Sequence, residues 1–223
     1  MIGNVCHVDE LGLDRSVSDP DFDLPDRVLA SHGVNGLYYL RAIYSFRLII
    51  IGYFRTIHVL YPILNAQNFL NSWSLLYDPM PPKHDPVLYS RLFLIVAIGL
   101  LSQPPALDLG FSVDEVCQEL HQKSWHLLHE VLARPHASSV QVILLHVRTH
   151  LDVAGRHSAD STLKVLYLVH FSKSGMAWVL CGLAIRIAQS IGLHREFSPD
   201  MGLPEEEIRV RSQIWWVCYT LDA

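Results

Sequence analysis

The chain has 223 residues, of which 50% are hydrophobic and only 17% are charged, and its formal net charge is −5 at pH 7. This apolar content excludes an intrinsically disordered chain, and the length suits one domain with its own core. The first 30 residues carry the whole net charge of −5 and the rest is neutral, so the chain lacks the basic field that a nucleic-acid-binding protein usually carries.

The spacing of the cysteines and the length of the apolar runs exclude further classes of protein. The four cysteines, Cys6, Cys117, Cys181 and Cys218, are too far apart for a compact zinc site or a dense disulfide scaffold. They are therefore predicted to be reduced, mostly buried thiols. The N-terminus lacks the basic-then-apolar order of a signal peptide. The longest apolar run, residues 92–101, is about half as long as a membrane-spanning helix needs to be, which predicts a buried helix and no membrane partner.

The first half of the chain is predicted to be a polar lead-in followed by helices. Residues 1–27 are acidic and contain two prolines, which predicts a disordered segment. Apolar stretches separated by proline-rich loops predict helices at residues 37–60, 65–77 and 87–101.

Start signals define two helices in the middle of the chain. In the segment Ser112-Val-Asp-Glu115 a side-chain acceptor precedes a glutamate by three residues, which is the order of a capping box. This helix is predicted to end near Ala133. A second helix is predicted to begin at the similar segment Ser138–Gln141 and to end near Gly155. The candidate core positions of the first helix are Val116, Leu120, Leu127, Leu128 and Val131.

Two more helices are predicted in the C-terminal third. Residues 162–193 have a helical pattern with a break near Gly175 and an end at Gly192. Pro204 opens the last helix, and three glutamates follow where the helix dipole favours acids. The predicted apolar face of the earlier helix is Val179, Leu183, Ile187 and Ile191. The predicted i,i+4 ion pairs of the last helix are Glu205–Arg209 and Glu207–Arg211.

These patterns together predict an all-α fold, an irregular multi-helix domain of about seven helices, because alternating strand patterns and internal repeats are scarce. Within it, Trp215 and Trp216 are predicted to be core residues, since adjacent helical side chains differ by about 100° and cannot form one flat stacking platform. Gly175 and Gly182 are predicted to mark a close helix crossing.

Thirteen histidines raise the hypothesis of a metal site. His146 and His150 are one helical turn apart, but a zinc peptidase needs a glutamate directly after the first histidine, and Val147 occupies that position. Because no third ligand can be named, the histidines are predicted to be partly exposed structural residues, and no metal, cofactor-binding or catalytic residue is predicted. The motifs of nucleophilic catalysis and phosphate binding are also absent, so the chain is not expected to be an enzyme. The second, weaker histidine group is His121, His126 and His129.

Two segments resemble a known family. The segment Ala177–Arg195 has the pattern AW-x-x-x-G-x-A-x-R-x-A-x-x-x-G-L-H-R, which resembles part of the fungal-specific transcription factor domain. This domain is the regulatory middle region of binuclear zinc-cluster, xylanolytic-activator-type transcription factors. Residues 207–222 are similar to the segment that follows in the family, and weaker likenesses extend back to residue 24. The family-signature residues are Trp178, Gly182, Ala184, Arg186, Ala188, Gly192, Leu193, His194, Arg195, Arg209, Arg211, Trp215, Trp216 and Asp222.

The chain also departs from the family pattern. Residues 28–223 look like a truncated regulatory domain, because the family's domain continues further and its N-terminal cluster of six closely spaced cysteines is missing. Residues 33–50 and 157–173 look inserted, and we hypothesise that they are translated introns or lineage-specific inserts. A truncated domain is expected to expose apolar surface.

The resemblance implies a nuclear regulatory domain in DNA-templated transcription, which acts through protein partners or self-association. DNA and zinc binding would belong to the missing cluster, with no cofactor in this chain. Two alternatives remain open: a small helical metal-dependent hydrolase that uses His146 and His150, and a membrane-associated helical protein.

Overall fold

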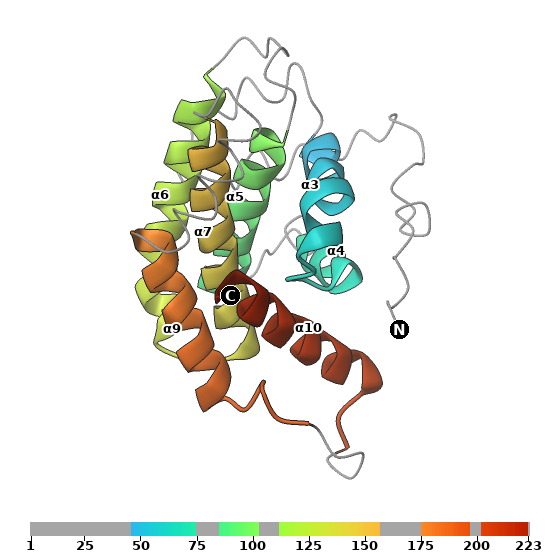
Figure 1. Cartoon of the computed structure of the whole chain (residues 1–223). Helices are drawn as coiled ribbons and strands as arrows, with labels where there is room; N and C mark the ends of the chain where they lie inside the picture. The colour runs from blue at the N-terminus through green and yellow to red at the C-terminus, as the bar shows by residue number, and fades with distance from the viewer. Residues whose placement is uncertain (1–45, 75–84, 103–111, 157–174, 197–201, 223) are drawn as a thin grey trace.

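The computed structural model describes residues 46–74, 85–102, 112–156, 175–196 and 202–222. These ranges contain seven helices and no strand, which confirms the predicted all-α class (Figure 1). The helices are α3 Phe46–Leu60, α4 Ala66–Ser74, α5 Pro86–Leu101, α6 Val113–Leu132, α7 Ala137–Arg156, α9 Met176–Ser190 and α10 Glu205–Asp222. The predicted lead-in and most of the two hypothesised inserts lie outside the described residues, as do residues 37–45, 75–77 and 162–174 of the predicted helices.

Helix α5 is the centre of the fold, with α6 and α7 packed on one side and α3 on the other (Figure 1). Every residue from Leu88 to Leu101 is buried except Arg91, which confirms the predicted buried helix. The helix begins after Asp85, whose carboxylate accepts hydrogen bonds at 3.0 Å from the backbone N–H groups of the second and third helical residues. Such a cap satisfies donors that the first helical turn leaves unpaired.

Helix α3 lies very close to α5 at Gly99. A Cβ atom on this glycine would lie 2.4 Å from the carbonyl oxygen of Ile49, so only a glycine permits the observed contact. The prediction of a close helix crossing at Gly175 and Gly182 was therefore wrong. A Cβ on Gly182 would meet only a side-chain nitrogen of Arg186 at 3.9 Å, and Gly175 precedes α9 with a φ of 109°.

Helices α6 and α7 form an antiparallel hairpin. The Ser112 hydroxyl accepts the N–H of Glu115 at 3.3 Å, which confirms the predicted N-cap of α6. Helix α7 begins close to its predicted start, but Gln141 does not cap it. Its side-chain amide donates to the carbonyl oxygen of Ile63 at 2.8 Å and accepts from Arg91, so it ties α7 to α5 and to the turn between α3 and α4. The predicted core positions of α6 are buried except Leu127, which is half-buried.

Candidate functional site: the C-terminal helices and a histidine cluster

Helix α9 carries many of the signature residues and packs against α7 through small side chains. Small side chains let two helices approach closely, and apart from Leu180 the buried residues of α9 are small. The predicted apolar face was therefore wrong by one position: Val179 is 54% exposed, and Leu183 and Ile187 are only half-buried. The buried stripe consists of Ala177, Leu180, Cys181, Ala184 and Ala188.

The end of α9 is set by Gly192, as predicted. Its φ of 78° is in the left-handed region, which favours glycine. The N–H of Leu193 donates to the carbonyl oxygen of Ala188 at 2.8 Å, and the N–H of Gly192 donates to that of Gln189 at 3.1 Å. This is the geometry of a Schellman helix end, and the buried side chain of Leu193 provides the apolar contact that accompanies it. Past this end, the signature residues His194 and Arg195 are exposed.

Helix α10 packs against α9 and α7 through Ile214, Val217 and Cys218. The two adjacent tryptophans have different environments: Trp215 is half-buried against the core, whereas Trp216 is 62% exposed. The prediction that both are core residues was thus wrong for Trp216. The rotation of about 100° per residue explains the difference, because a helix lying on a surface buries only one of two neighbours.

Large apolar side chains are exposed on both signature helices, which agrees with the expected exposure of apolar surface. On α10 the rings of Trp216 and Tyr219 meet edge to face, with centroids 5.8 Å apart, and both residues are more than half exposed. On α9 the exposed residues are Met176, Trp178 and Val179. Apolar side chains in contact with water favour association with another surface.

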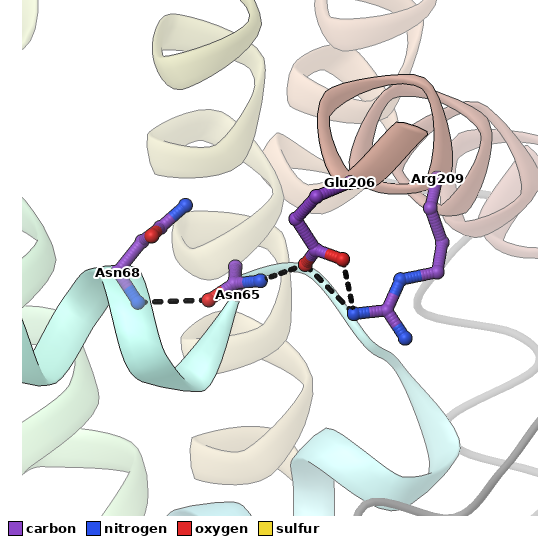
Figure 2. Close-up of polar contacts among 4 residues, drawn as sticks. All are labelled: Asn65, Asn68, Glu206 and Arg209. Carbon is purple, nitrogen blue, oxygen red and sulfur yellow. Dashed lines mark hydrogen bonds and ion pairs between the residues drawn. The ribbon is translucent and has the colours of Figure 1, made fainter. Parts of the chain in front are cut away.

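Polar contacts link the start of α10 to the turn before α4 (Figure 2). The side-chain Oδ1 of Asn65 accepts the backbone N–H of Asn68 at 2.7 Å and so caps α4. Its side-chain nitrogen donates to Glu206, which also forms an ion pair with Arg209 at 2.6 Å. Arg209 therefore pairs with the glutamate three residues before it, one position later than the predicted partner. The predicted Glu207–Arg211 pair is confirmed at 2.9 Å.

Helices α6 and α7 bring together three histidines that belong to two separate groups in the sequence. His146 is completely buried, with its Nε2 3.0 Å from the Ser124 hydroxyl and its Nδ1 3.1 Å from Nε2 of His121. The ring of His150 lies 4.7 Å from that of His121. Partial exposure was therefore wrongly predicted for His146, and the third histidine that the sequence could not name is His121. The other two members of its group, His126 and His129, are exposed.

Burial keeps these three imidazoles neutral. It lowers the pKa of His146 to about 3 and that of His121 to about 4, and it also lowers the pKa of His150. The neighbouring imidazoles lower the pKa values of His146 and His121 further, because two positive charges this close repel each other. At pH 7 the cluster is thus a neutral, hydrogen-bonded contact between α6 and α7.

The geometry lends no support to the hydrolase alternative. Both ring nitrogens of His146 are engaged inside the protein, by Ser124 and by His121. Within the part of the chain that the structure describes, no group of three or more histidine, cysteine or carboxylate side chains is arranged to hold a metal ion.

None of the helices in the described ranges has the length and apolar character needed to cross a membrane.

Comparison with known proteins finds a family domain that is similar to the C-terminal part of the chain. Residues 161–223 match the model of the fungal specific transcription factor domain, so the resemblance seen in the sequence is confirmed. The C-terminal part of the chain is thus similar to part of this domain. No solved structure matches the chain.

Three relatives illustrate the similarity. The aurofusarin cluster transcription factor aurR2 of Gibberella zeae is 43% identical over 61 residues, which are 27% of this chain and 9% of the relative. The lactose regulatory protein LAC9 of Kluyveromyces lactis is 23% identical over 197 residues, 86% of this chain and 19% of the relative. The transcriptional activator protein DAL81 of Saccharomyces cerevisiae is 24% identical over 208 residues, 93% of this chain and 17% of the relative. The chain thus spans less than a fifth of the length of each of these three.

Proposed function

We propose that the chain acts in the nucleus as a regulatory domain in DNA-templated transcription, and that it works by contacting proteins rather than by catalysing a reaction. The match of residues 161–223 to the fungal specific transcription factor domain carries this proposal. The exposed apolar side chains of α9 and α10 support contact with a protein, because they offer surface that association would bury.

The proposal assigns DNA and zinc binding to a separate module of such a regulator and no cofactor to this chain. The neutral charge balance after residue 30 supports this assignment, because DNA affinity comes mainly from basic side chains that neutralise phosphates. We expect the purified chain to show no sequence-specific shift of DNA in a gel assay at physiological salt. A tight, sequence-specific shift would contradict the assignment.

A reporter assay tests the regulatory role. The chain is fused to an unrelated DNA-binding domain in a fungal host, and reporter transcription is compared with that from the DNA-binding domain alone. We expect the fusion to change the output, and we expect Trp178→Ser with Trp216→Ser to reduce this change, since both side chains are more than half exposed. The matched control is Gln189→Ser with Ser212→Ala at exposed polar positions of the same helices. A nuclear, well-expressed fusion with unchanged output would refute the proposal.

A further inference from the structure

The α6–α7 hairpin is held near its middle by titratable side chains. His121 on α6 and His146 and His150 on α7 form one cluster, in which the ring centroids of His121 lie 4.9 Å from His146 and 4.7 Å from His150. The indole ring of Trp125 stacks on His121 and meets His146 edge to face. We propose that this cluster is a proton-sensitive joint, closed while its imidazoles are neutral and opened when they are protonated.

The hydrogen bonds of the cluster require neutral rings. A neutral imidazole has one N–H donor and one acceptor nitrogen, so the chain Ser124–His146–His121 can be satisfied in either direction. When both histidines are protonated, every ring nitrogen is a donor and the bond between His146 and His121 is lost. Two cations then face each other inside the hairpin, and their repulsion favours separation of α6 from α7.

The charged groups that the structure describes around the cluster do not offset such a charge. Among the described residues, the groups that shift the pKa values of these imidazoles electrostatically are the cluster's own histidines. On α5, Arg91 binds Gln141, and on α7 the guanidinium of Arg148 lies over the ring of Tyr61. Glu119 and Lys123 on α6 are each two positions from His121, about 200° around the helix. On the helices packed against α7, the side chain of Arg186 is exposed. The carboxylate of Asp222 contributes to the raised pKa values of Cys181 and Cys218.

The sign of the pH effect follows from the lowered pKa values. The folded-state pKa values of His121 and His146 are about 4 and about 3, whereas an unfolded histidine has a pKa of about 6.5. The stability that the cluster contributes is therefore present above pH 6.5 and is lost as the pH falls towards these folded values. Each histidine that stays neutral only in the folded state lowers the folding equilibrium constant about 25-fold between pH 7 and pH 5.

Urea unfolding at pH 5, 6 and 7 tests the joint in the whole chain. Between pH 7 and pH 5 the folding equilibrium constant of the original chain should fall about 600-fold more than that of the variant His121→Gln with His146→Gln, since the variant lacks two such histidines. The control His126→Gln with His129→Gln changes two exposed histidines of α6 and should keep the dependence of the original chain. Both retain His58 on α3, whose pKa is lowered by burial to about 4 and whose contribution therefore cancels in the comparison. An unchanged pH dependence in the cluster variant would overturn the proposal.

Two measurements on the unsubstituted chain decide the matter even if the cluster variant fails to fold. Histidine NMR signals should show the imidazoles of His121 and His146 neutral at pH 6. Amide hydrogen exchange, corrected for its intrinsic pH dependence, should show protection in α6 and α7 falling before that in α3 and α5 as the pH is lowered. Protonated cluster histidines in a fully protected hairpin, or simultaneous loss of protection in all four helices, would overturn the joint.

Discussion

The contact between α3 and α5 gives a sharp prediction, because it depends on the lack of a side chain at Gly99. In Gly99→Ala the new Cβ would lie 2.4 Å from the Ile49 carbonyl oxygen and 2.7 Å from the Ile49 Cγ2. A side chain could rotate away, but a backbone carbonyl cannot, so the two helices must move apart. Overpacking of this kind costs about 1–3 kcal/mol, while the better helix propensity of alanine returns about 1 kcal/mol.

Gly182→Ala is the matched control, since this glycine also lies inside a helix and its added Cβ would meet only the end of a flexible arginine side chain. Both substitutions gain the same propensity, so their difference in unfolding free energy measures the crossing alone. We expect Gly99→Ala to be less stable than Gly182→Ala by about 1–3 kcal/mol in urea unfolding, with a melting temperature lower by roughly 2–4 °C per kcal/mol. Equal stabilities would refute the reasoning that the glycine sets the helix separation.

Substitutions at three further positions test local contacts by urea unfolding. Gly192→Ala should cost about 1–2 kcal/mol, because alanine is strained at a φ of 78°; no loss would mean that the end of α9 rearranges freely. Ser112→Ala should cost about 1 kcal/mol, since it removes the N-cap of α6, whereas Ser112→Asp should preserve the cap. Asn65→Ala should cost about 1 kcal/mol through α4, and Asn65→Asp should keep the cap while setting a carboxylate against Glu206.

The helix boundaries could be predicted because local chemistry sets them. Ser112 and Gly192 act within one helical turn of themselves, so the residues that cap a helix are close to it in the sequence. The central helix α5 could be predicted equally well from the sequence, since an apolar stretch of that length between proline-rich loops has to be buried.

Contacts between helices were harder to predict, since the relevant partners are distant in the sequence. The polarity of Gln141 fits a helix cap as well as it fits a bond to Ile63, and only the packed structure distinguishes them. The histidine cluster could have been found from the hairpin itself. A short turn folds α7 back on α6, and this register places His121 opposite the residues near His150.

The face of α9 illustrates a limit of reading hydrophobicity alone. Periodicity favours the large residues Leu183 and Ile187, but the buried residues are the small Ala184 and Ala188, one position further along. Hydropathy ranks side chains by their transfer from water, whereas the distance between two helices depends on side-chain volume.

Burial also separates the signature residues into two sets. Ala184 and Ala188 are fully buried, so the approach of α9 to α7 accounts for their small size. Trp178 and Trp216 are more than half exposed, and packing among the helices that the structure describes does not account for such large apolar side chains. Substitutions at the first two positions would therefore change stability and function together. Substitutions at the two tryptophans change the surface while the core stays intact, which makes them the cleaner test of contact with a partner.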